Sequence, residues 1–427
     1  MASYVFVLML PPSPSCRGAS YHSAIVDPRH ATLTTREIFM SGLKDQLAQA
    51  IDRLGDELEH LSRRIHDHPE LGYQEVQACG WLSEFLAAKG LKVERGVAGV
   101  DTAFRATLET GDGPTIAIMC EYDALPGLGH ACGHNVIATA GAGAGVALAA
   151  LKDKLPKGRI QVIGTPAEEG GGGKIKLIRG GVFAKVDAAM MIHGLDAWIG
   201  HPDLLGIVRL VFEFTGKAAH AAMDPWEGVN ALDGVIQTFN NVAMLRQQAR
   251  PDARIHGIIT NGGGAPNIIP ESAAALFYVR APQLDDMWQL VERVEACAEG
   301  AAKATGSELK TTRLDTHYEP MKRNMALLDA FRANMKALGV ESPPMKDRAG
   351  SSDVGNVSQV IPTIQPYVQI APAGTPIHSR AFEAAAVTPL ARDGMLKAAK
   401  VMAMTTLDLL DEPGLLARVQ QEFRSPR

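Results

Sequence analysis

A cysteine and a histidine stand two residues apart in the segment Gly129–Asn135, a spacing that suits a metal site. In an extended loop, residues i and i+2 point the same way, so Cys132 and His134 can face one ion. Glu168 and Glu169 are adjacent and project differently, which lets one bind an ion while the other acts as a general base. A structural Cys–His pair explains the first motif equally well, and an acidic pair is usually a solvated turn.

Two further histidines can be either metal ligands or structural residues. His193 follows the apolar run Met190–Ile192, and His378 lies in the segment Pro376–Ser379. Imidazole is a common metal ligand, but a lone histidine at the end of an apolar strand is more often a core residue. These histidines therefore indicate a metal site only in combination with the other motifs.

Two glycine-rich stretches look like nucleotide-binding loops but lack essential residues. In Gly170–Lys174, the first glycine of a phosphate loop is missing, and Ile175 stands where Ser or Thr must bind magnesium. Gly141–Gly145 lacks the third glycine of the dinucleotide fingerprint, and we interpret it as close helix packing. We therefore set nucleotide binding aside.

The patterns of helices and strands place these polar residues at one edge of a sheet. Apolar residues recur at helical spacing from Met40 to about Lys89, and β-rich runs then alternate with helices, which is typical of a doubly wound, mostly parallel α/β sheet. Ligands bind beyond the carboxyl ends of such strands. The acidic pair, His193 and the segment Glu121–Asp123 each follow an expected strand; these strands cover residues 160–164, 188–193 and 115–120.

A β-α-β-β-α-β pattern between residues 206 and 316 predicts an inserted, ferredoxin-like α+β domain. Its expected strands cover residues 208–214, 255–260, 274–279 and 308–314, and its helices cover 229–245 and 284–304. The catalytic domain is then discontinuous, over residues 40–205 and 317–427, and ends with a helix at 324–338, a strand at 363–370 and a helix at 389–410. Residues 1–39 show no periodicity, and we expect a non-structural extension there.

Charge and cysteine usage narrow the class of protein. The 42 basic and 47 acidic residues give a net charge of −5 with no basic stripe, which disfavours binding to nucleic acid or to an anionic membrane. No apolar run is long enough for a membrane-spanning helix. The five cysteines are odd in number and scattered, which fits a reducing compartment, so we expect a cytoplasmic protein.

Taken together, the motifs resemble those of the zinc- and manganese-dependent metallopeptidases that include carboxypeptidase G and aminoacylase. They most resemble the amidohydrolase branch, with aminobenzoyl-glutamate hydrolase and the auxin-conjugate hydrolases. The resemblance independently implies an inserted lid domain. The matching stretches run in family order: His66–Gly72, Glu121–Gly127, Cys132–Asn135, Glu168–Gly173, His193–Gly194, Gly216–Ala221, Pro266–Pro270 and Ser351–Val357.

The resemblance implies a site for two divalent metal ions, with Glu168 as the general acid and base and Asp123 as a support that binds no metal. Many relatives have a bridging aspartate where this chain has Cys132, so the metal is either zinc, which a thiolate with imidazoles favours, or manganese. The implied ligands are Cys132, His134, Glu169, His193 and His378.

The resemblance also implies roles for residues of the inserted domain. His220 matches a histidine that reaches into the partner subunit's active site and polarises the scissile carbonyl, although a surface histidine in a turn is the alternative. Asn267 and Arg280 match residues that bind the substrate carboxylate; for Arg280, a salt bridge on the strand face is the alternative. A homodimer formed through the inserted domain follows from the role of His220.

These inferences predict a dinuclear-metal amidohydrolase that cleaves the amide of an N-acyl amino acid or of a dipeptide with a free carboxylate. Carboxypeptidase or deacetylase specificity at the same site is an alternative. A non-catalytic protein that keeps the fold without the chemistry is a second alternative.

Overall fold

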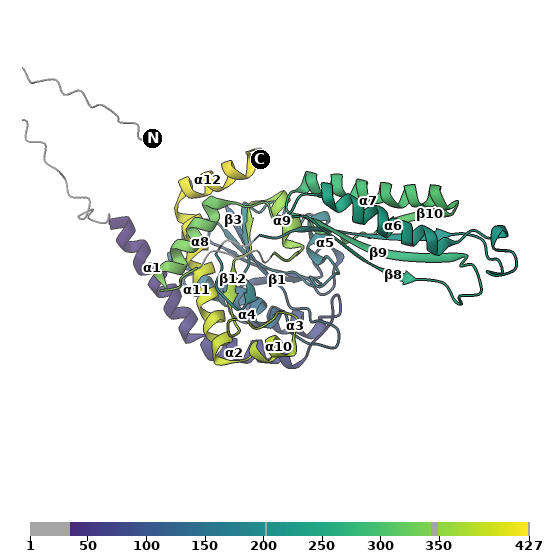
Figure 1. The fold of residues 1–427 in the computed structure, drawn as a ribbon. Coiled ribbons are helices and arrows are strands. Elements are labelled where there is room, and N and C mark those ends of the chain that lie inside the picture. The colour runs from purple at the N-terminus through teal and green to yellow at the C-terminus, as the bar shows by residue number, and fades with distance from the viewer. Residues whose placement is uncertain (1–34, 201–202, 343–348, 426–427) are drawn as a thin grey trace, which may run out of the picture. The chain divides into compact units, whose positions relative to one another are not determined.

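The computed structural model describes residues 35–200, 203–342 and 349–425 (Figure 1). Among these residues, 35–42 belong to one unit of the structure, and the described residues from Leu43 onward belong to a second. Most of the expected extension at 1–39 lies outside the described residues. Helix α1 (Thr35–Arg53) begins ahead of Met40, so the last residues of that segment are helical.

The main sheet of the second unit has six strands in the order β1-β2-β4-β3-β5-β11. The pairs β4–β3, β3–β5 and β5–β11 are parallel, which confirms the predicted mostly parallel sheet, whereas β1–β2 and β2–β4 are antiparallel. Strands β1 and β2 were not predicted; β1 is largely exposed and has no apolar alternation. The strand bounds are β1 (Lys92–Arg95), β2 (Phe104–Glu109), β3 (Thr115–Cys120), β4 (Arg159–Gly164), β5 (Ala188–Met190) and β11 (Thr363–Ile364).

Helix α4 (His134–Ala150) packs against β3 and β4 and is itself in contact with α2, α3 and α11. A Cβ on Gly141 would lie 2.5 Å from Sγ of Cys120, and one on Gly145 would lie 2.4 Å from Cγ2 of Val162. The prediction that this glycine-rich stretch serves helix packing is therefore confirmed. The neighbouring helices are α2 (Gly55–Asp67), α3 (Val76–Ala88) and α11 (Pro389–Asp411).

The inserted elements follow the predicted β-α-β-β-α-β order and form a second, fully antiparallel sheet in the order β10-β7-β9-β8. Helices α6 and α7 pack on this sheet around their own apolar core, which includes Phe212, Val235, Phe277 and Val291 (Figure 1). The limits of the domain, 206–316, stay a prediction. The elements are β7 (Gly206–Thr215), α6 (Ala231–Leu245), β8 (Arg254–Asn261), β9 (Ser272–Ala281), α7 (Leu284–Thr305) and β10 (Glu308–Arg313).

The strands predicted at 188–193 and 363–370 are each broken in two. After β5 the chain forms β6 (His193–Leu195), and after β11 it forms β12 (Tyr367–Gln369), which pairs with β6 in parallel. Pro366 stands at the second break, where its missing N–H cannot continue the main ladder, and its carbonyl accepts a hydrogen bond from the amide of His193 at 2.9 Å. The break moves His193 out of the main sheet.

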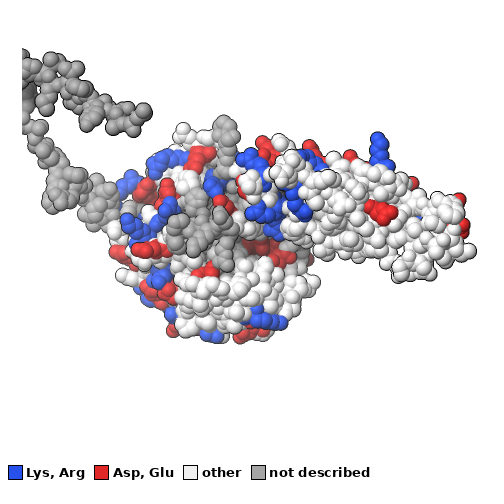
Figure 2. Space-filling model, viewed as in Figure 1, with Lys and Arg blue, Asp and Glu red and all other residues white. Residues whose placement is uncertain are grey.

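The remaining helices complete the second unit. The predicted helices at 324–338 and 389–410 are confirmed as α8 and α11, whereas α9, α10 and α12 were not predicted. None of the helices in the described ranges is long and apolar enough to cross a membrane. On the face shown in Figure 2, basic and acidic side chains are intermixed. The bounds are α5 (Gly173–Arg179), α8 (Met325–Ala337), α9 (Val354–Val360), α10 (Arg380–Ala385) and α12 (Pro413–Arg424).

Candidate active site

Gly133 shapes the loop that carries the first two predicted ligands. Its φ of 76° lies in the left-handed region, and a Cβ there would lie 2.4 Å from Cδ1 of Ile370, so only glycine fits without rearrangement. Helix α4 then begins at His134. Cys132 and His134 therefore both lie at the start of a buried helix, with 4% and 0% of their surface exposed.

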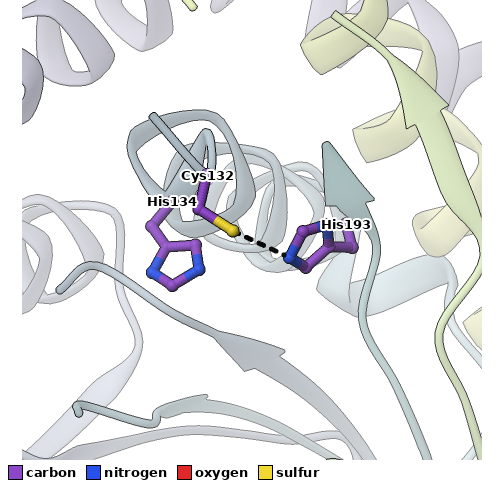
Figure 3. Close-up of side chains that lie close together, drawn as sticks. All are labelled: Cys132, His134 and His193. Carbon is purple, nitrogen blue, oxygen red and sulfur yellow. Dashed lines mark hydrogen bonds between the residues drawn. The ribbon is translucent and has the colours of Figure 1, made fainter. Parts of the chain in front are cut away.

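The donor atoms of the predicted ligands converge in two overlapping groups. One joins Cys132, His134 and His193, the other joins Cys132, Glu169 and His378, and within each group the donor atoms lie within 4.8 Å of one another. In the first group, Sγ of Cys132 lies 3.4 Å from Nε2 of His193 (Figure 3). In the second, Nε2 of His378 lies 3.4 Å from Oε1 of Glu169. The structure thus brings together all five residues, and Cys132 is common to both groups.

Hydrogen bonds orient two of the imidazoles. Nδ1 of His193 lies 2.9 Å from the carbonyl oxygen of Gly194, and Nδ1 of His134 lies 3.1 Å from Oδ1 of Asp123. Because both oxygens accept, Nδ1 is the donor in each case, and Nε2 of the neutral ring keeps a free lone pair. Nε2 of His134 is buried and has no hydrogen-bond partner among the described residues. Such a nitrogen, beside a thiol and carboxylates, fits a transition-metal site.

Burial shapes the protonation of these groups. It lowers the pKa of His193 to about 4, so the ring is neutral at physiological pH, as a metal-binding imidazole must be. Burial and the carboxylate of Glu169 raise the pKa of the Cys132 thiol well above its usual value, so its ionisation calls for a positive charge nearby. Burial acts against the charged form of His134, but Cys132 and Asp123 outweigh it and raise its pKa.

The two adjacent carboxylates have different electrostatic environments. Burial, reinforced by the negative charges of Glu121 and Glu169, raises the pKa of Glu168 well above its usual value. Burial acts on Glu169 as well, but the neighbouring imidazoles of His378 and His134 together outweigh that effect and lower the pKa. Glu169 is therefore suited to be an ionised ligand, whereas Glu168 is suited to hold and transfer a proton.

A buried ion cluster next to Glu168 was not predicted. Nζ of Lys174 is paired with Glu121 and lies 2.6 Å from Oδ1 of Asp353, and all three side chains have no exposed surface. Burial disfavours the charged lysine, but Asp353 and Glu121 outweigh it and raise the pKa of Lys174. One carboxylate oxygen each of Glu121, Glu168 and Asp353 lie within 4.8 Å of one another, so the cluster belongs to the surroundings of Glu168.

A cavity of about 440 Å³ is lined by four of the five predicted ligands, Cys132, Glu169, His193 and His378. Its lining includes Glu168 and two arginines from the inserted sheet, Arg209 on β7 and Arg280 on β9. Nη1 of Arg280 donates to Oγ of Ser351 at 3.1 Å, and its buried Nε has no partner among the described residues. The guanidinium of Arg209, which was not predicted, lies 5.0 Å from the ring centre of Tyr318. Neither arginine forms an ion pair with a described carboxylate, so the cavity offers two cations to an anionic group.

The structure does not bring the other two predicted residues into this cavity. His220 and Asn267 are both exposed, and neither is among the described residues that line it. They lie close to each other, since the amide of Ala221 donates to the carbonyl of Asn267 at 3.0 Å and His220 forms a bridge with Ile268. Nδ1 of His220 accepts hydrogen bonds from the amides of Ala222 and Met223, at 3.2 and 3.1 Å, so Nε2 carries the proton of the neutral ring.

Comparison with known proteins gives concordant matches. The model of the peptidase family M20/M25/M40 matches residues 117–406. The Xaa-Arg dipeptidase of Mus musculus is 40% identical over 400 residues, covering 90% of this chain and 92% of that protein. A p-aminobenzoyl-glutamate hydrolase chain of Escherichia coli is 32% identical over 440 residues, covering 85% of this chain and 91% of that one.

Solved structures share the fold. A dinuclear metal binding peptidase of the M20 family from Bacillus subtilis superposes with a TM-score of 0.69 at 22% identity, covering 84% of this chain and 99% of that one. The aminobenzoyl-glutamate utilization protein from Klebsiella pneumoniae superposes with a TM-score of 0.67 at 20% identity, covering 86% and 99%. The predicted fold class is confirmed by these neighbours.

Proposed function

The chain belongs to the peptidase family M20/M25/M40 and is a hydrolase of amide bonds, and on that premise we propose that it cleaves N-acyl amino acids or dipeptides with a free carboxylate. The observation that carries this proposal is the cavity in which two overlapping groups of metal-ligand side chains meet Glu168. The names of two relatives, an Xaa-Arg dipeptidase and a p-aminobenzoyl-glutamate hydrolase, support the same class of substrate.

We propose that Cys132, His134, Glu169, His193 and His378 hold two divalent ions. A thiolate with several imidazoles favours zinc over manganese. When bound, such ions lower the pKa of a coordinated water from 15.7 to about 7 and polarise the substrate carbonyl. Oδ1 of Asp123 lies 3.1 Å from Nδ1 of His134 and holds the ring in the tautomer that leaves Nε2 free to bind a metal ion. Oδ2 of Asp123 also accepts a hydrogen bond from the amide of Glu169 at 2.9 Å.

Proton transfer is the role that we propose for Glu168. Its carboxyl group accepts a proton from the attacking water and returns it to the leaving amine. The raised pKa of Glu168, caused by burial and by its carboxylate neighbours, favours a carboxyl group that holds the proton between these two steps. Tyr318 fixes the backbone here, because its hydroxyl donates to the carbonyl of Glu168 at 2.6 Å and accepts from the amide of Gly170 at 3.0 Å.

Arg280 and Arg209 are the groups that we propose for the free carboxylate of the substrate. A substrate panel tests this role and the function together: N-acyl amino acids, aminobenzoyl-glutamate and dipeptides ending in arginine, each with a free and with an amidated carboxyl group. We expect mass spectrometry to detect cleavage of the free acids by zinc-loaded enzyme and much weaker cleavage of the amides. Arg280→Ala is expected to raise KM for the free acids at least ~10-fold, as the loss of a charge-assisted hydrogen bond implies.

The panel also separates the alternatives. Cleavage of acetylated amino acids alone would identify a deacetylase. Tripeptides added to the panel test the other alternative, because removal of their C-terminal residue would identify a carboxypeptidase. No hydrolysis with either zinc or manganese would contradict the proposed function. Equal rates for free and amidated substrates would contradict the role of the arginines and the preference for a free carboxylate, but not the hydrolysis of amide bonds.

We further propose that the enzyme is a homodimer formed through the inserted elements. Strand β8 is an edge of its sheet, and its Ile258 and Ile259 are 62% and 46% exposed. An apolar edge strand is suited to pair with another copy. Charged side chains are sparse over the inserted elements in the view of Figure 2. His220 and Asn267 also lie among the inserted elements and do not line the cavity of their own subunit. In a dimer they can contact substrate in the cavity of the partner subunit.

Mixing two inactive variants tests the action of His220 in the partner's site. His220→Ala and Glu168→Gln are each expected to be inactive. In a mixed dimer, the subunit with an intact Glu168 receives the intact His220, so subunit exchange should restore about a quarter of the wild-type activity at equal mixing. The rate of hydrolysis before and after exchange measures this recovery. Mixed dimers that form, as shown by native mass spectrometry, but stay inactive would contradict the proposal.

A cytoplasmic location remains part of the proposal. Its support is that Cys79, Cys120, Cys132 and Cys297 are all free thiols in the described part of the chain.

A further inference from the structure

Glu75 is a buried carboxylate at the N-terminus of helix α3 that does not cap this helix. Glu70 does so instead, because its carboxylate accepts hydrogen bonds from the amides of Gln77 and Ala78 at 3.0 Å. Glu75 itself has no exposed surface, and its Oε1 accepts a hydrogen bond from the amide of Ala167 at 2.8 Å.

Ala167 has an unusual backbone conformation. Its φ of 58° lies in the left-handed region, which a non-glycine residue adopts only when its surroundings hold it there. The surroundings are tight: a Cβ on Gly72 would lie 3.0 Å from Cβ of Ala167, and one on Gly171 would lie 2.7 Å from it. The turn at Ala167 comes directly before Glu168, so it determines where the next side chains point.

Tyr73, two residues before Glu75, binds the other end of the turn that begins at Ala167. The hydroxyl of Tyr73 donates to the carbonyl of Gly171 at 2.6 Å. Glu75 therefore accepts from the amide of Ala167 and Tyr73 donates to the carbonyl of Gly171, so these two residues hold the turn on either side of Glu168 and Glu169. The segment between α2 and α3 therefore fixes the backbone of residues 167–171 through these two hydrogen bonds.

We propose that Glu75 and Tyr73 are positioning residues, which hold the turn 167–171 so that Glu168 and Glu169 face the cavity. This inference rests on the proposed roles of Glu168 and Glu169. It assigns a task to two residues that directly follow the stretch His66–Gly72, since each of them forms a hydrogen bond with the turn.

The hydrogen bond from Ala167 does not need a charge on Glu75. Burial raises the pKa of Glu75 to about 7, and either a neutral or an ionised carboxyl oxygen accepts an amide hydrogen. Glutamine offers the same acceptor in the same place, whereas leucine has a similar size and no acceptor. These two substitutions separate the hydrogen bond from the charge.

Steady-state kinetics at saturating zinc test the proposal. We expect Glu75→Leu to lower kcat at least ~10-fold with KM changed less than about three-fold, because small displacements of reacting groups reduce rates strongly. Glu75→Gln should stay within about three-fold of the wild-type kcat. Tyr73→Phe, at a half-buried site that tolerates the change, should lower kcat by about three-fold or more with an unchanged KM. It keeps the test decisive if the leucine variant does not fold.

Glu70→Gln is the matched control. It weakens the cap of α3 without touching the turn 167–171, so it should lower the melting temperature and leave kcat within about two-fold. A kcat of Glu75→Leu or of Tyr73→Phe at the wild-type level would overturn the proposal. A loss in Glu75→Gln as large as that in Glu75→Leu would also overturn it, because the charge would then matter instead of the hydrogen bond.

Glu168→Gln, measured in parallel, separates a failure of the proposed function of Glu168 from a failure of the positioning role of Glu75 and Tyr73. If that variant turns over normally, the proposed function of Glu168 fails. If that variant is inactive while Glu75→Leu and Tyr73→Phe have normal kcat values, only the positioning role fails.

Discussion

Glu168→Gln is expected to lower kcat at least ~10²-fold, the usual contribution of general acid–base catalysis, while the protein keeps its fold and its metal content. Glutamine has the shape of glutamate but cannot accept a proton from water or return one to the leaving amine. The proposed ligand next to it, Glu169, is left in place. Single-turnover kinetics with a chromogenic N-acyl amino acid and metal analysis of the same sample measure the two effects.

The control for this prediction is Glu319→Gln. Burial raises the pKa of Glu319 as well, but its carboxyl group is not among those that line the cavity. That variant should keep a kcat close to that of the wild type. Glu169→Gln should behave differently from both, since loss of a proposed ligand lowers metal affinity, and part of its activity should return at high zinc concentration. Near-normal turnover of metal-loaded Glu168→Gln would refute the role of Glu168.

The sequence was sufficient to predict the residues that act through local motifs. Cys132 and His134 share one loop, and Glu168 and Glu169 directly follow a strand, so short stretches carry both their identity and their placement. The parallel sheet was predictable for the same reason, because its central strands are continuous apolar runs. That the five proposed ligands meet was expected from the resemblance and is now seen in the geometry; that they bind metal stays a prediction.

Residues whose role depends on distant partners could not be predicted. Lys174 follows a run of glycines that resembles an incomplete phosphate loop. Its buried ion pair depends on Asp353, 179 residues further along the chain. Arg209 alternates with apolar residues on β7 and looks like an ordinary outward-facing strand residue. The break that places His193 in β6 depends on Pro366, which lies far along the chain.

Lys174→Met is expected to destabilise the protein by roughly 3–5 kcal/mol, the usual cost of removing one partner from a buried ion pair. Methionine fills a similar volume but leaves Glu121 and Asp353 without their cation in a place that has no exposed surface. Urea unfolding of the metal-free protein, followed by fluorescence, measures the free energy of unfolding. Lys397→Met, which removes only the exposed i,i+4 pair with Asp393, should cost less than about 1 kcal/mol.

The loss in Lys174→Met comes from the unpaired carboxylates and not from the missing lysine itself. Burial already raises the pKa of Asp353 to about 6 with the lysine present, so this carboxyl is close to accepting a proton. Adding Glu121→Gln and Asp353→Asn to Lys174→Met removes both buried charges, and the triple variant should therefore recover most of the lost stability. Its kcat should be lower than that of the wild type, because the charges next to Glu168 are gone. A triple variant no more stable than Lys174→Met would show that packing, and not charge, determines the stability of this cluster.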